Sequence, residues 1–169
     1  MTQQILRQLF SRKAPPKTTQ PRPRAMMDSL ESRTMLTVVH VGPNEAVKSL
    51  DAVKWPTSSS ASLDVVIDSS STPYSVSHHG VWGNVTIEPA NAKNPPTIKL
   101  AQTNYPTFYS NGKLLIKGIK TSGGYKGILT GTNTKGSVEV DNVTMTDGGS
   151  IWRGQGCVNA TFHNNNVFG

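Results

Sequence analysis

Short apolar segments recur along the second half of this chain at intervals of roughly 22 to 25 residues, a self-similarity that is typical of repeat architectures. Residues 114–119 have the same pattern as residues 138–143, and residues 160–164 take it up again. Residues 127–131 recur in the same way as residues 150–154, with Ile128 matched by Ile151 and Gly131 by Gly154.

Each repeat alternates apolar and polar residues, as at Leu114 and Ile116 or at Val138 and Val140, and such residues share one face of a strand. Gly or Asn follows where the chain must bend. One coil cannot bury its own apolar row, but coils stacked about 4.8 Å apart form a continuous apolar interior. We therefore expect an all-β solenoid over residues 38–169. The alternative is a β-sandwich, which would not repeat Gly and Asn at a near-constant spacing.

The two ends of this region differ from the repeats. Residues 38–41 and 63–67 have the pattern of strands, and residues 45–55 carry apolar residues at helical spacing before Pro56. This order predicts an N-terminal capping strand and helix. The chain ends at Gly169 inside an expected coil. We therefore expect either a domain truncated at that end or end-to-end self-association through the open coil.

The positive charge is concentrated at the N-terminus. The net charge is +7, of which residues 1–33 contribute +5 and the rest only +2. Residues 14–24 contain four prolines among polar residues, so we expect residues 1–37 to be a disordered basic leader. The remaining charge is too dilute to bind nucleic acid. No apolar run is long enough for a transmembrane span.

Two resemblances to known families follow from these patterns. Leu30, Glu31, Arg33 and Leu36 match the LEPRxLL-type N-terminal motif of planctomycete-type surface proteins, although Ser32 stands in place of its proline. This resemblance implies export to the cell envelope or the medium. The repeats resemble the right-handed parallel β-helix of pectate-lyase-like proteins, which implies that fold for residues 38–169.

Candidates for catalysis are few. Asp141 and Asp147 are the best carboxylate pair for a glycoside hydrolase, but they could meet only across a bend. Lyases of the β-helix type use a basic residue beside acidic Ca²⁺ ligands. The resemblance to them implies that Lys126 or Arg153 would be the basic residue here. We expect no active site in this chain, and Ca²⁺ only if it is part of a lyase. His78 and His79 would point to opposite faces of a strand, and Cys157 is the single cysteine, so we expect no metal site.

The aromatic side chains suggest a binding role. Four of them would form a stacking platform for sugar rings if they lie on the outer face: Tyr105, Tyr109, Tyr125 and Trp152. Ser, Thr and Asn exceed a quarter of the chain, which suits hydrogen bonding to neutral glycans. We expect a secreted or cell-surface module with a scaffolding, adhesive or polysaccharide-binding role. The alternative is the N-terminal part of a polysaccharide lyase or glycoside hydrolase with catalytic coils beyond residue 169.

Overall fold

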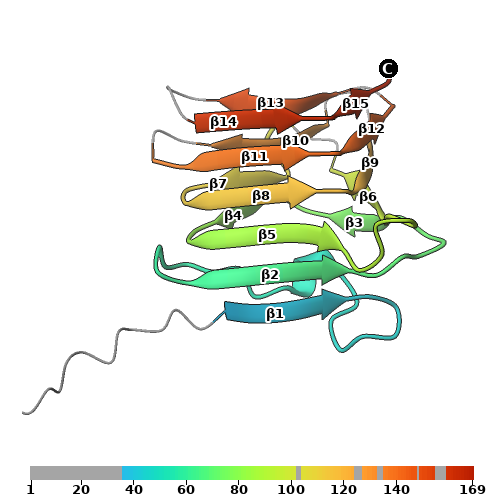
Figure 1. Cartoon of the computed structure of the whole chain (residues 1–169), viewed down its shortest axis with the longest axis horizontal. Coiled ribbons are helices and arrows are strands. Elements are labelled where there is room, and N and C mark those ends of the chain that lie inside the picture. The colour runs from blue at the N-terminus through green and yellow to red at the C-terminus, as the bar shows by residue number, and fades with distance from the viewer. Residues whose placement is uncertain (1–35, 102–103, 124–126, 133–134, 148, 155–158) are drawn as a thin grey trace, which may run out of the picture. The chain divides into compact units, whose positions relative to one another are not determined.

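Parallel strands stack in successive coils, which confirms the predicted solenoid (Figure 1). The computed structural model describes residues 36–169 except 102–103, 124–126, 133–134, 148 and 155–158. Within that part of the chain every strand pair is parallel. The β-sandwich alternative is wrong, because a sandwich is built from antiparallel sheets.

The described strands form three sheets, which we name A, B and C. Sheet A contains β1 (Leu36–Val41), β2 (Ser62–Ile67), β5 (Asn84–Pro89), β8 (Lys113–Lys117), β11 (Ser137–Asp141) and β14 (Asn159–His163). Sheet B contains β3 (Tyr74–Val76), β6 (Thr97–Leu100), β9 (Lys120–Gly123), β12 (Thr144–Thr146) and β15 (Asn166–Val167). Sheet C contains β4 (His79–Val81), β7 (Phe108–Ser110), β10 (Ile128–Thr132) and β13 (Ser150–Gly154).

The register of the strands confirms the predicted repeat in sheet A and corrects it in sheet C. In sheet A, Val138 pairs with Leu114 on one side and with Ala160 on the other, as the sequence match predicts. In sheet C the prediction is wrong by one position, because Ile128 pairs with Ser150 and not with Ile151. Gly131 accordingly pairs with Arg153 and not with Gly154.

The bend from sheet A to sheet B uses a left-handed residue, as the recurring Gly and Asn predict. Gly118, Asn142 and Asn164 directly follow β8, β11 and β14 and have φ of +64°, +52° and +50°. Only Gly and, at moderate cost, Asn adopt this conformation readily. Backbone hydrogen bonds join the bends of successive coils: the Gly118 N–H donates to Asp141 O (2.9 Å) and the Asn142 N–H to His163 O (3.0 Å).

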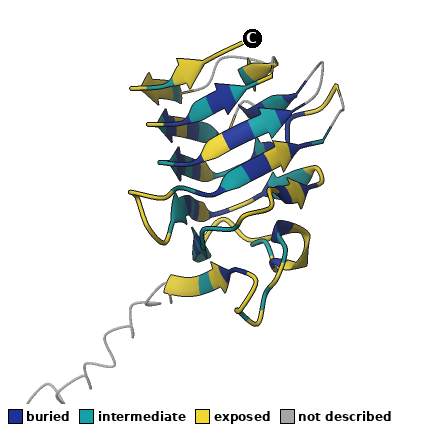
Figure 2. Cartoon of the chain, turned by 90° about the vertical axis from the view of Figure 1, so that its right-hand side faces the viewer, coloured by how far each residue is buried: buried dark blue, intermediate teal, exposed yellow. Residues whose placement is uncertain are grey.

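The apolar core runs along the axis of the stack. The alternate residues of sheet A point inward, and Val65, Ile87, Ile116 and Val140 are fully buried in one continuous row. Figure 2 shows the resulting alternation of buried and exposed residues along the strands. Each coil thus closes the apolar row of its neighbour, which is why a single coil could not be stable alone.

The predicted capping helix is wrong. Between β1 and β2, among the described residues, only a 3₁₀ turn forms, η1 (Leu50–Ala52). Val47 makes a parallel bridge with Val41, and its carbonyl accepts the Gly42 N–H (3.0 Å). The chain therefore makes a loop directly after β1, runs beside Val41 in the same direction at Val47, and then buries Leu50 and Val53 from a segment without a regular helix. No helix in the described part of the chain is long and apolar enough to cross a membrane.

Candidate functional site

One row of residues on the outer face of sheet C alternates glycines with residues that have long side chains. Gly80, Tyr109, Gly131 and Arg153 pair in register across β4, β7, β10 and β13. Their neighbours Phe108 and Thr130 point inward and are buried. Because successive residues of a strand face opposite sides, the four residues of this row face outward. Tyr109 and Arg153 therefore stand two coils apart, with a glycine between them.

The segment directly before β7, residues 104–107, covers that glycine, and we call it the covering segment. A Cβ atom on Gly131 would lie 2.5 Å from Pro106 Cγ, so the proline ring rests directly on the glycine. The segment is anchored to both neighbouring coils, because the Thr107 N–H donates to Ile128 O and the His79 N–H donates to Thr107 O, each at 2.8 Å. A side chain at position 131 would displace the proline from this seat.

These elements enclose a pocket of about 200 Å³ that is lined by His78, Tyr105, Pro106, Tyr109 and Arg153. The His78 ring lies 6.1 Å from the Tyr105 ring and 6.4 Å from the Tyr109 ring, measured between centroids. His78 Nδ1 hydrogen bonds with the Pro106 carbonyl, and the Arg153 guanidinium donates to the Asn104 carbonyl. Both polar side chains are thus held by the same covering segment. The pocket offers aromatic faces, two phenol groups and one cationic donor.

A second exposed aromatic residue stands on the same face. A Cβ atom on Gly80 would lie 2.8 Å from Cζ3 of Trp82, so the indole lies over that glycine. Trp82 is 40% exposed and Tyr105 is 68% exposed. Large aromatic groups left in solvent on one face are a feature of binding surfaces.

The stacking candidates separate into two groups in the structure. Tyr105 and Tyr109 line the pocket. Trp152 instead belongs to the inward row, because it pairs with Thr130, and its ring packs 5.9 Å from that of Phe162. Tyr125 lies outside the described residues.

The catalytic candidates do not share a site among the described residues. Asp141 ends β11 in sheet A, where it accepts a hydrogen bond from Asn164 Nδ2 (3.2 Å). Asp147 follows β12 of sheet B in a left-handed conformation, with φ of +67°. Arg153 lies in sheet C at the pocket, and Lys126 lies outside the described residues. No group of three or more His, Cys, Asp or Glu in the described part of the chain could hold a metal ion.

The motif matched to the export signal lies almost wholly outside the described residues. Leu30, Glu31 and Arg33 belong to the undescribed N-terminal part of the chain. Leu36 is the first residue of β1 and is exposed on that strand.

Asp51, Ser77 and His79 form a separate polar cluster. The Asp51 carboxylate accepts hydrogen bonds from the Ser77 N–H (2.8 Å), from Ser77 Oγ (3.1 Å) and from His79 Nε2 (2.7 Å). Burial by itself would raise the pKa of Asp51, but these hydrogen bonds outweigh it and lower the pKa. The serine donates to the aspartate and not to the histidine, so the cluster does not activate a nucleophile. It fastens residues 45–55, which we call the capping segment, to β4.

The sequence did not single out His78 as a pocket residue. His78 lies two residues before Gly80, so it faces the same outer side of the segment around β4. What could not be deduced is that the segment before β7 folds back over it.

Comparison with family models, with curated proteins and with solved structures finds no significant match to this chain.

Proposed function

We propose that this protein is a carbohydrate-binding β-helix module of the pectate-lyase-like type, acting at the cell surface or after secretion. The observation that carries the proposal is the pocket formed by His78, Tyr105, Tyr109 and Arg153 over the floor of Pro106. Sugar rings have apolar C–H faces that stack on aromatic side chains, and hydroxyl groups that need hydrogen-bonding partners at their edges. The pocket supplies both within a volume suited to a single sugar ring.

The position of the pocket also supports a polymeric ligand. The outer row of sheet C crosses the strands, so a chain running along the solenoid axis would meet residues from successive coils about 4.8 Å apart. Trp82 provides an aromatic surface on the coil before Tyr109. In this proposal the pocket holds one ring, and the scaffolding or adhesive role follows from retention of the polymer. The alternative of an enzyme fragment gains no support from Asp141, Asp147 and Arg153, which lie apart.

The test is binding of the full chain to a panel of immobilised neutral and acidic polysaccharides, followed by calorimetric titration with an oligosaccharide of the best ligand. We expect Tyr109→Ala to weaken binding about tenfold, the loss for one stacking contact of roughly 1.4 kcal/mol. Tyr109→Phe should retain most of the affinity, because the ring face is kept.

Phe168→Ala is the matched control, because Phe168 is an exposed aromatic residue that does not line the pocket. It should leave the affinity unchanged. Thermal unfolding followed by circular dichroism would verify that each variant is folded. If no polysaccharide binds, or if Phe168→Ala weakens binding as much as Tyr109→Ala, the proposal is wrong.

A further inference from the structure

Glycine forms the corner through which the chain passes from sheet C to sheet A. Gly83, Gly112 and Gly136 directly precede β5, β8 and β11, so they stack on one another in successive coils. A Cβ atom on Gly112 would lie 2.6 Å from Gly83 N, and one on Gly136 would lie 2.9 Å from the carbonyl carbon of Ser110. The missing side chains of these glycines would therefore collide with atoms of the preceding segments, so glycine at the corner lets successive coils stack closely.

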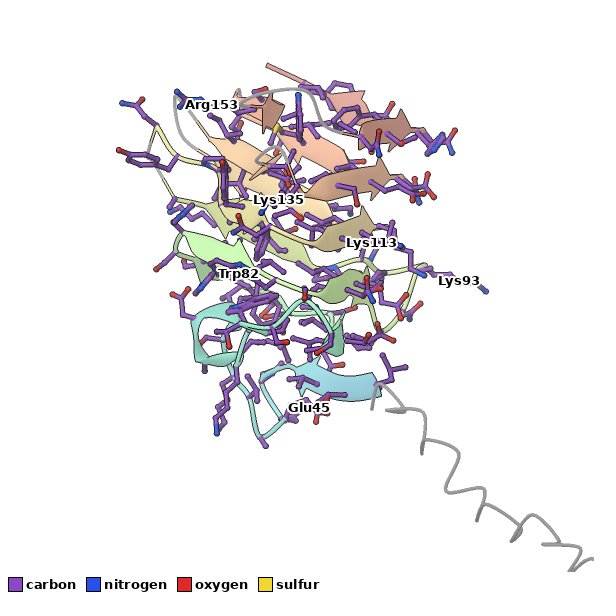
Figure 3. The ribbon with its side chains drawn as sticks, turned by 90° about the vertical axis from the view of Figure 1, so that its left-hand side faces the viewer. Glu45, Trp82, Lys93, Lys113, Lys135 and Arg153 are labelled. Carbon is purple, nitrogen blue, oxygen red and sulfur yellow. The ribbon has the colours of Figure 1, made fainter. Side chains whose placement is uncertain are left out.

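A hollow of about 550 Å³ lies against this corner. Besides the three glycines, its lining consists of Ser59, Asn84, Asn111, Lys113, Lys135, Ser137 and Asn159. The two lysines carry all of the charge of this lining. Lys113 follows one corner glycine and Lys135 precedes the next, which places them on neighbouring coils on the face drawn in Figure 3. The amide and hydroxyl groups of the asparagines and serines add further hydrogen-bond donors to this lining.

Lys113 forms no ion pair with an acidic residue in the described part of the chain. The carboxylate nearest in register is Glu139, which lines an adjoining groove over sheet A together with Lys113, but the two side chains form no ion pair. Lys117 on the same strand differs, because its ammonium group contacts Glu88 at 2.6 Å. Lys113 therefore forms no ion pair with a carboxylate of the described residues, and its ammonium group is not tied to one.

We propose that the corner hollow binds a tetrahedral oxyanion, a sulfate or phosphate ester carried on a polymer. Two ammonium groups on neighbouring coils, with amide and hydroxyl donors between them, can reach several oxygens of such a group. A planar carboxylate would leave part of this donor set unused. This inference uses residues that do not line the pocket on sheet C and does not depend on the proposed function.

The experiment is a titration of the ¹⁵N-labelled full chain with dextran sulfate, with uncharged dextran as the control polymer and polyphosphate as the second anion. Binding at the corner shifts the backbone amide resonances of Gly83, Gly112 and Gly136, whereas dextran leaves them in place. The anion that binds more tightly identifies the ester. If either anion binds without shifting the glycine resonances, or if dextran shifts them equally, the inference is wrong.

Two variants test the role of the lysines. Lys113→Gln and Lys135→Gln should each weaken anion binding about three- to tenfold, as expected for loss of one charge-assisted contact at an exposed site. Lys99→Gln, which removes an exposed lysine on β6 of sheet B, should change nothing. An equal loss in Lys99→Gln would show that the charge acts non-specifically and would overturn the site.

Tyr109→Ala separates this inference from the proposed function. It should leave the affinity for dextran sulfate unchanged while weakening glycan binding at the pocket. If Tyr109→Ala abolished both, the anion would be bound at the pocket and the corner assignment would fail.

Discussion

At the scale of single residues, Asn142 shows how one backbone angle sets the path of a coil. It has φ of +52° in the bend between β11 and β12, the position taken by Gly118 one coil earlier. We predict that Asn142→Ala lowers the free energy of unfolding by about 1 kcal/mol, because alanine has no side-chain compensation for the left-handed conformation. Asn142→Gly should be neutral or slightly stabilising. Urea unfolding of both variants measures the difference.

Asn84→Ala is the control for that comparison, because Asn84 begins an extended strand where alanine fits. It should cost less than Asn142→Ala. Equal costs at the two positions would mean that side-chain contacts, and not the backbone conformation, explain the asparagine at the bend.

Individual residues also show which features could be predicted from the sequence and which could not. The alternation of side chains along a strand predicts that Tyr109 and Phe108 face opposite sides, but which of them faces outward was left open. The bends at Gly118, Asn142 and Asn164 could be predicted from conformational preference alone. Membership of the pocket could not, because His78 meets Tyr105 and Tyr109 only through the fold of the intervening coil.

At the scale of elements, the capping segment is where the sequence pattern was most misleading. The apolar residues between 45 and 55 have helical spacing, yet only Leu50–Ala52 form a 3₁₀ turn. Tertiary contacts decided the outcome. The Trp55 ring packs 5.4 Å from both His79 and Phe108, and Asp51 hydrogen bonds to the segment around β4. Periodicity reports which residues are buried and does not distinguish a helix from an irregular segment under a sheet.

The fastening of this segment predicts a pH dependence. The folded state lowers the pKa of Asp51, so its hydrogen bonds stabilise the fold above the ordinary aspartate pKa, near 4. That contribution is lost as pH falls through the lowered pKa. Asp51→Asn should therefore be less stable than the wild type at pH 6 to 7, and the gap should close in acid. Thermal unfolding at a series of pH values measures it.

Asp64→Asn is the matched control, because Asp64 lies on the outer side of β2 and makes no side-chain hydrogen bond in the described part of the chain. The role given to the carboxylate would be contradicted if the difference in unfolding temperature between the wild type and Asp51→Asn stayed constant down to pH 2.

At the scale of the whole molecule, each coil is supported by the coils on its two sides. Internal coils such as that of β8 have neighbours on both sides, whereas Phe162, Val167 and Phe168 of the last coil are exposed. Stability in such a stack is close to a sum of nearest-neighbour terms. We predict that amide hydrogen exchange of the full chain is slowest in β5, β8 and β11 and becomes faster toward β1 and β15.

Hydrogen exchange followed by mass spectrometry would resolve this gradient by peptide. Uniform protection from β1 to β15 would show that the chain unfolds as one unit and would contradict the prediction.

The sequence was most informative at this scale, because the period of Gly, Asn and apolar residues already implies stacked coils. The register of sheet C was missed because Ile128 and Ile151 are identical and invite alignment. Their backbones are nevertheless offset, since Ser150 is the true partner of Ile128. Likeness between side chains predicts the presence of a repeat, but the backbone hydrogen bonds of the two strands decide its register.

Equivalent positions of sheet A are unevenly spaced along the chain, yet their strands stay in register. The inward positions that pair from coil to coil are Thr37, Leu63, Val85, Leu114, Val138 and Ala160. The longest step runs from Val85 to Leu114 and includes the covering segment with Tyr105 and Pro106. Extra residues can therefore enter between strands without disturbing the stack. In the longest step they supply Tyr105 and Pro106 of the pocket, while Tyr109 and Arg153 come from the strands beneath them. The length of the connection before β7 can therefore vary independently of the strand register that fixes the two side chains under it.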